Sequence, residues 1–124
     1  MRPAIVSISD DVTGDDTRVT VRLDWAERSY EGLAVGSSAQ QVRLAGEAAL
    51  DAVVKIVNGS VELELLAVAT TDFGNASIAL AQVRFDHGDV LVGSALLGDV
   101  DSRLAAVRAV MDAINRRMEP LLGT

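Results

Sequence analysis

The run DVDSRLAAVRAVMDAINRRM, residues 99–118, carries the clearest structural signal in the chain. Six of its large apolar residues are spaced by four, three, four, three and four positions, so they form one stripe of an α-helix. The stripe consists of Val100, Leu104, Val107, Met111, Ile114 and Met118. We therefore expect an amphipathic helix that packs on a core, with Asp99 or Asp101 as its N-terminal cap.

Three apolar segments before this helix predict strands. Residues 61–68 alternate apolar and acidic side chains until the phase shifts after Leu65, which indicates a bulge or burial on both faces. Residues 78–85 and 90–97 form the next two segments, and the DHGD between them is typical of a tight hairpin. The polar stretch TTDFGNAS, residues 70–77, is interpreted as the turn between the first two strands.

The same order of elements is predicted upstream. Residues 4–9, 19–25 and 29–35 have the residue types and alternation of strands. The acidic stretch DDVTGDD, residues 10–16, has the composition of an exposed hairpin turn. The first half therefore predicts three strands before its own helix.

The first helix should begin after the third strand, with Ser37 or Ser38 as its cap. Ser38 and Gln41 have the spacing of a capping box. The helix should end at Asn58-Gly59, where glycine can adopt the left-handed conformation. Its apolar arc is wide in the second half, so we expect burial on more than one side, by the sheet and by another subunit.

The two halves also share identical residues at a constant offset. Three pairs lie 61 positions apart: Gly32 and Gly93, Ala34 and Ala95, and Asp51-Ala52 and Asp112-Ala113. The shared order of elements and this offset predict a duplicated α+β fold, βββα-βββα. We expect two antiparallel three-stranded sheets, each packed on a helix and related by a pseudo-twofold, in a single domain 1–124 with repeats 1–59 and 60–124.

Composition argues against several function classes. The 124 residues carry a net charge of −7, with 11 Lys and Arg against 18 Asp and Glu, and only 3% aromatic residues, so we expect no nucleic-acid partner. There is no cysteine, and no apolar run approaches the ~18 residues of a membrane span, which predicts a cytoplasmic protein with no membrane partner. His87 is the single histidine, so neither a metal, a cofactor nor a serine-histidine enzyme is expected.

The second half resembles the carboxy-terminal regulatory domain of 2-isopropylmalate synthases and citramalate synthases, here as a stand-alone chain. AVATTDFGNASIAL, residues 67–80, is similar to that family's strand, Gly-Thr-Asp-type turn and strand. GSALLGDVD, residues 93–101, is similar to its Gly-x-Gly strand end and acidic helix start, and RAVMDAINR, residues 108–116, to its final helix. Ala95 stands at the second glycine of Gly-x-Gly, and Gly36-Ser37-Ser38 replaces the family's Gly-Pro turn. The resemblance implies a fold of two βββα units.

The resemblance also implies a function and a site. It implies a non-catalytic regulatory module that binds a branched-chain amino acid-like effector at the interface of a homodimer. The candidate ligand-binding residues carried over from the matching loops are Thr71, Asp72, Gly74, Asn75, Gly93, Asp99 and Asp101. These residue types also suit turns and helix caps, which is the alternative interpretation.

Two main hypotheses follow for the function. The chain is a small-ligand-binding regulatory module, dimeric or docked on another protein, or it is a dimerisation or scaffold module that has lost the ligand. A third hypothesis is a small enzyme that works through carboxylate pairs such as Asp99 with Asp101 or Glu62 with Glu64. Capping and an exposed strand face explain those pairs equally simply, so no catalytic residue is assigned.

Overall fold

The predicted duplication is confirmed in the computed structural model of the chain, which describes residues 2–123. Its elements are β1 (Ala4–Thr13), β2 (Asp16–Trp25), β3 (Arg28–Ser37), the short 3-10 helix η1 (Ser38–Gln40), α1 (Gln41–Ile56), β4 (Leu63–Phe73), β5 (Ala76–Phe85), β6 (Val90–Leu96) and α2 (Ser102–Met118). β1-β2-β3 form one antiparallel sheet, here called sheet A, and β4-β5-β6 form another, sheet B.

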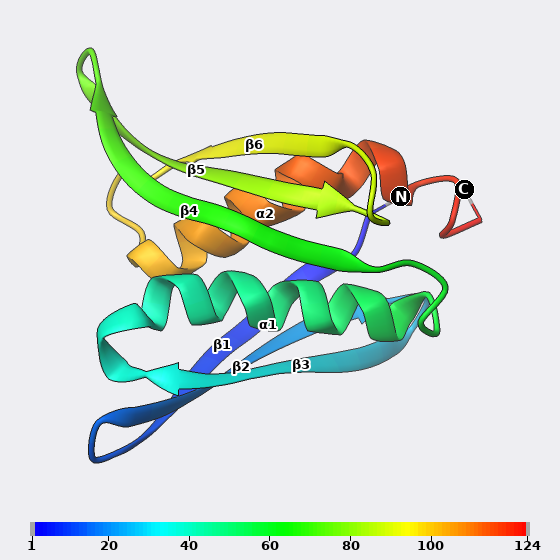
Figure 1. Cartoon of the computed structure of the whole chain (residues 1–124), viewed down its shortest axis with the longest axis horizontal. Helices are drawn as coiled ribbons and strands as arrows, with labels where there is room; N and C mark the ends of the chain where they lie inside the picture. Colours follow the sequence, from blue (N-terminus) through cyan, green and yellow to red (C-terminus); the bar gives the residue numbers. More distant parts are fainter. Residues whose placement is uncertain (1, 124) are drawn as a thin grey trace.

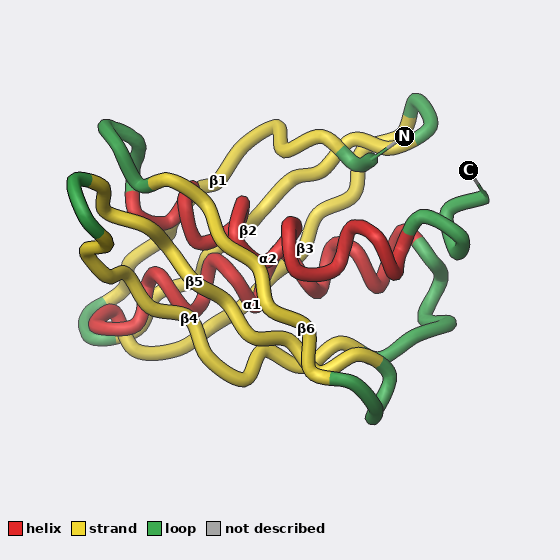
Figure 2. The backbone as a smooth tube through the Cα atoms, turned by 90° about the horizontal axis from the view of Figure 1, so that it is seen from above, coloured by secondary structure: helices red, strands yellow, loops and turns green. Residues whose placement is uncertain are grey.

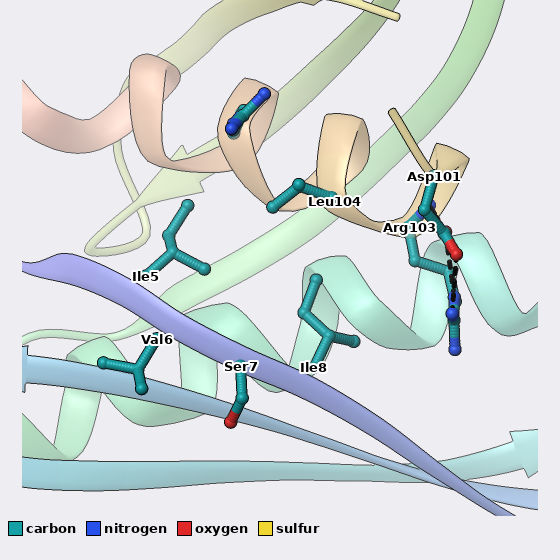
Figure 3. Close-up of a pocket in the computed structure, with 8 residues that line it drawn as sticks. Ile5, Val6, Ser7, Ile8, Asp101, Arg103 and Leu104 are labelled. Carbon is teal, nitrogen blue, oxygen red and sulfur yellow. Dashed lines mark hydrogen bonds and ion pairs between the residues drawn. The ribbon is translucent and has the colours of Figure 1, made fainter. Parts of the chain in front are cut away.

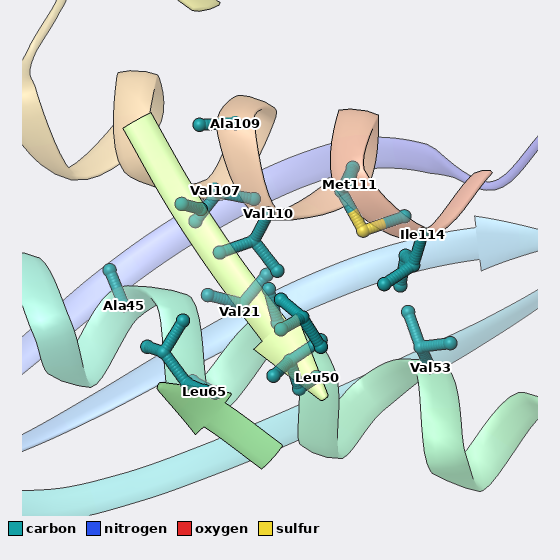
Figure 4. Close-up of a cluster of buried hydrophobic side chains, with 14 of the residues drawn as sticks. Val21, Ala45, Leu50, Val53, Leu65, Val107, Ala109, Val110, Met111 and Ile114 are labelled. Atoms are coloured by element: carbon teal, nitrogen blue, oxygen red, sulfur yellow. The ribbon is translucent and has the colours of Figure 1, made fainter. Parts of the chain in front are cut away.

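The two helices lie in a middle layer between the sheets (Figure 1). α1 packs on β2 and β3, α2 packs on β5 and β6, and the helices contact each other. Viewed from above, sheet B lies over both helices (Figure 2). Both sheets and both helices contribute to one apolar cluster, which includes Val21, Leu50, Leu65 and Val110 (Figure 4). Neither half could bury its helix on both sides alone, so the duplication completes the core.

Each helix approaches the last strand of its own sheet so closely that only glycine fits there. A Cβ atom at Gly32 would lie 1.8 Å from the carbonyl oxygen of Ala48, and one at Gly93 would lie 2.2 Å from that of Ala109. Backbone atoms cannot move aside as a side chain can. The offset of 61 positions between the two glycines therefore reflects one packing arrangement used twice.

The offset between the halves is not constant, however. Val21 pairs with Gly32 and Ala81 pairs with Gly93, so the middle strands correspond at 60 positions and the last strands at 61. The added residue lies in the β5–β6 hairpin, where the amide of Phe85 donates to the carbonyl of Asp89 over 2.8 Å. The corresponding β2–β3 hairpin has no such bulge, because Trp25 pairs directly with Arg28.

Two predicted turns were wrong in extent. β1 continues to Thr13 and β4 to Phe73, so each turn consists of two residues only, Gly14-Asp15 and Gly74-Asn75. Each glycine has a φ of 63°, the left-handed value that opens a tight type II′ hairpin. The polar side chains that suggested long turns instead belong to strand ends exposed to solvent.

The predicted capping box of the first helix was also wrong. The Ser37 hydroxyl accepts from the Ala39 amide over 3.2 Å, while the Ser38 hydroxyl lies 2.7 Å from that of Thr17. Ser37 thus caps η1, which precedes α1, and Ser38 does not cap α1. The predicted C-terminus is confirmed, because Asn58 and Gly59 both have positive φ and the Gly59 amide donates to the carbonyl of Val54.

The wide apolar arc of α1 is covered inside the chain. Its buried residues face sheet A, α2 and β4, and Gly46 lies where the ends of Leu65 and Val110 approach most closely. The observation that suggested a second subunit on α1 is thus explained by α2 and β4.

Candidate functional site

Four of the seven candidate ligand-binding residues lie together at the end of the β4–β5 hairpin. Thr71, Asp72, Gly74 and Asn75 are all exposed there. Asp72 accepts a hydrogen bond from the hydroxyl of Ser77 over 2.6 Å, which ties the two strands across the turn. The turn projects from the body of the molecule (Figure 1).

The other three candidates lie apart from this tip. Gly93 is buried in the middle of β6 against the backbone of α2, and Asp99 is exposed in the loop that follows β6. Asp101 is the N-cap of α2, because its side chain accepts from the amide of Arg103 over 2.7 Å. Of the seven, Asp101 lines a cavity of about 530 Å³.

That cavity lies between β1 and the first turns of α2 and has a volume of about 530 Å³. It is lined by Ile5, Val6, Ser7 and Ile8 of β1, and by Asp101, Arg103, Leu104 and Arg108 of α2 and its cap. Ile5 and Ile8 point from the strand toward the helix, and Leu104 points back toward them (Figure 3). The size suits a small organic ligand.

A fixed ion-pair network closes one end of the cavity. Arg103 binds Asp101 through Nε at 2.9 Å and through Nη2 at 2.6 Å, and its Nη1 binds Asp10 of β1. The hydrogen bonds from the Arg103 side chain and amide lower the pKa of Asp101 to about 2, and the Asp101 carboxylate raises the pKa of Arg103. Asp101 and Arg103 therefore stay charged at neutral pH, and the network joins β1 to α2.

The pseudo-symmetric counterpart of the β1–α2 contact is the contact between β4 and α1, and it is built differently. β4 lies close against α1, where the Arg43 guanidinium donates to the Leu65 carbonyl over 2.8 Å. Position 104 corresponds to position 43 but holds leucine, which cannot form this bond. α1 has Gly46 at the contact, whereas the corresponding residue of α2 is Val107. The lost tie and the added bulk agree with the looser packing of β1 on α2 than of β4 on α1. A cavity of about 410 Å³ also lies at the β4–α1 contact, where Arg43 is bonded to Leu65 and paired with Glu47.

The cavity has one charged group with no partner. Both oxygens of Asp101 and three nitrogens of Arg103 are already engaged with each other or with Asp10. Arg108 has no hydrogen bond or ion pair with any residue between 2 and 123. In a chain of net charge −7, this cavity thus offers an unpaired cation beside isoleucine and leucine side chains.

Other groups with potential chemistry are accounted for by local pairs. His87 Nε2 lies 2.8 Å from Glu62 at an exposed hairpin, and Arg84 lies 3.7 Å from Glu64. Within residues 2–123, no three His, Cys, Asp or Glu side chains are grouped so as to hold a metal ion. The helices of that same range are too short or too polar to cross a lipid bilayer.

Sequence reasoning missed most of the cavity. Ile5 and Ile8 were predicted only as part of a strand, and Leu104 as part of the apolar stripe of the last helix. Arg103 and Arg108 were not singled out. The signal that would have drawn attention to them is the difference between the repeats, Leu104 in place of Arg43.

A scan of known protein families finds none whose model matches the chain, and a search of curated proteins finds no significant match.

Proposed function

We infer that the chain is a non-catalytic regulatory module that binds a small carboxylate-bearing ligand in the cavity between β1 and α2. The observation that supports this proposal is a break in pseudo-symmetry in the lining of two equivalent cavities. In the β4–α1 cavity of about 410 Å³, Arg43 is bonded to Leu65 and paired with Glu47. In the β1–α2 cavity of about 530 Å³, the corresponding positions hold Leu104 and the unpaired Arg108.

The lining favours a ligand with one carboxylate and a short branched aliphatic part. Arg108 can bind a carboxylate, and Ile5, Ile8 and Leu104 can cover an apolar side chain. A branched-chain amino acid has both parts, which agrees with the family resemblance of the second half. The corresponding 2-oxo acids have them too, without an ammonium group.

The direct test is ligand-induced stabilisation. The melting temperature should rise when leucine, isoleucine, valine or their 2-oxo acids are added at millimolar concentration, because a ligand that binds only the folded state stabilises it by mass action. A larger rise in melting temperature with the 2-oxo acids would mean that the cavity binds the carboxylate, through Arg108, and does not bind the ammonium group. A flat response to both sets of compounds contradicts the proposal.

Paired arginine variants locate the site. Arg108→Ala should abolish the ligand-induced shift, whereas Arg116→Ala should keep it. Both arginines are exposed on α2 and neither has a partner among residues 2–123, so the two variants remove the same charge from the same helix. Equal shifts in the two variants would move the site away from the β1–α2 cavity.

A dimerisation module is the second candidate function. One specific feature favours it, the apolar outer face of sheet B, on the side away from the helices. The two functions are compatible, because the cavity and this face lie on different parts of the molecule.

A further inference from the structure

The two sheets present different outer faces although they share one fold. Directly opposed residues of antiparallel strands point to the same face, so the register identifies the outer positions. On the middle strands, Arg18 and Thr20 of sheet A correspond to Ile78 and Leu80 of sheet B, 60 positions later. The central strand has therefore exchanged a charged and a polar residue for two apolar ones.

The last strands show the same change. Ser29 and Glu31 of β3 correspond to Val90 and Val92 of β6, 61 positions later. Val92 is 63% exposed and Leu96 is 68% exposed. On β3 of sheet A the exposed apolar residues are Leu33 and Val35, beside Thr20 and Arg18. On β1, Val6 and Val12 are exposed as well.

The first strands complete the comparison. Ser7 and Ser9 of β1 correspond to Ala67 and Ala69 of β4, and the Phe73 side chain at the end of β4 is 77% exposed. The resulting surface, here called the sheet B face, comprises Phe73, Ile78, Leu80, Val90, Val92 and Leu96. Contiguous exposed apolar surface of this kind marks interaction sites in soluble domains.

Any contact would use this face rather than an edge of the sheet. On β6 the amide of Ser94 already donates to Asp112 over 2.9 Å, which blocks the middle of that edge. On β4 the bulge between Leu65 and Ala67 breaks the other edge, and the Leu65 carbonyl is engaged by Arg43. Bulges and capped edges disfavour strand addition.

Charge identifies the occupant. The face holds a single charged pair, Glu64 with Arg84 at one end, so its net charge is zero within a chain of net charge −7. A partner recruited by opposite charge would find nothing to recognise here, whereas an identical face matches it in polarity and neutrality. A twofold contact also places each apolar strand against its own copy.

We propose that the sheet B face is the surface through which two copies of this chain associate, sheet packed on sheet. This inference rests on the dimerisation candidate above and is independent of ligand binding. The strands β4, β5 and β6 have 11, 10 and 7 residues. At ~3.3 Å per residue and ~4.8 Å between strands, they present roughly 400 to 450 Å² of flat sheet. A standard stable interface covers about 800 Å² per partner, so the dimer is weak and concentration-dependent.

The experiment is sedimentation equilibrium of the whole chain at roughly 10 to 500 μM, repeated at low and high NaCl. The wild type should dimerise within this range. Salt should strengthen the association, because the contact is apolar and the two copies repel each other through their net charge. Weakening by salt would indicate an ionic interface and overturn the assignment.

Two matched variants test the face. Val92→Asp should raise the dissociation constant of the dimer at least about tenfold, whereas Val35→Asp should leave it unchanged. Val35 is the control because it is 59% exposed on the outer face of sheet A, close to the 63% of Val92. Thermal unfolding establishes that both variants fold.

The remaining outcomes separate the face from the dimer. A wild type that dimerises equally well with either variant overturns the sheet B face and leaves the dimerisation candidate standing on another surface. A wild type that stays monomeric across the whole range overturns both, and the ligand-binding proposal is unaffected.

Discussion

The backbone amide of Leu33 donates a hydrogen bond to Oδ2 of Asp51 over 2.9 Å, from the edge strand of sheet A to the helix that packs on it. Sheet B repeats this contact between Ser94 and Asp112, also at 2.9 Å. The close approach allowed by the preceding glycine brings each aspartate within reach of the strand. A helical carboxylate therefore closes the same edge in both halves.

Asp112→Ala should lower the free energy of unfolding by about 1 to 2 kcal/mol, because the Ser94 amide loses its charged acceptor. Urea unfolding measures the change. Asp99→Ala is the control, since Asp99 is exposed in a loop and has no bond to any residue within 2–123, and it should change stability by less than about 0.5 kcal/mol. Equal stability of the two variants would show that the edge contact contributes nothing.

Gly93→Ala should cost about 3 kcal/mol or more, since its Cβ would lie 2.2 Å from the Ala109 carbonyl and 2.3 Å from the Ala113 amide nitrogen. The helix would have to move off the sheet. Gly88→Ala is a suitable comparison, because its Cβ would lie at ordinary contact distance, 3.4 Å from the Phe85 carbonyl oxygen and 4.0 Å from that of Asp86. We expect a change below about 1 kcal/mol. Guanidinium unfolding distinguishes them, and a mild effect at Gly93 would mean that the strand can yield.

The order of elements was predictable because each signal is local. The apolar spacing of the last helix and the glycine that ends the first reflect helix geometry directly. The identities at Gly32 and Gly93 reflect a backbone contact that tolerates nothing else. The strand ends were not predictable in the same way, since Thr70 and Asp72 on an exposed strand have the composition of a turn.

The cavity depended on tertiary information. Leu104 looks like any core leucine, and its meaning appears only beside Arg43, once the repeat register places them at equivalent contacts. The offset between the two halves changes from 60 to 61 positions at the β5–β6 hairpin. The offset of 61 seen in the sequence therefore could not align the first strands. The site therefore had to be located from the packing of β1 on α2.

Arg43→Met should destabilise the chain by about 1 to 2 kcal/mol, because the Leu65 carbonyl loses a charged donor while the aliphatic stem is retained. The rate of amide hydrogen exchange should increase most along β4. Arg18→Met provides the control, since Arg18 is exposed on the outer face of sheet A without a partner among residues 2–123. If β4 exchanges no faster than in the Arg18 variant, the tie between α1 and β4 is not what holds the strand.

Asp101 should make stability depend on pH in the acid range. Its folded-state pKa is about 2, below the ~3.9 of an unfolded aspartate, so the unfolded chain binds the proton more readily. The stabilisation is present above about pH 4 and is lost as the pH falls toward 2. Its size is reduced by solvent, because the side chain is 47% exposed.

Asp101→Asn tests this directly, because asparagine still caps a helix but does not titrate. Urea unfolding at pH 7, 4, 3 and 2.5 should show a smaller acid loss of stability in Asp101→Asn than in the wild type. Asp99→Asn, two residues earlier, should follow the wild-type dependence. Parallel curves of unfolding free energy against pH for Asp101→Asn and the wild type would mean that Arg103 stabilises the neutral and charged side chains equally. The charge of Asp101 would then contribute nothing to stability.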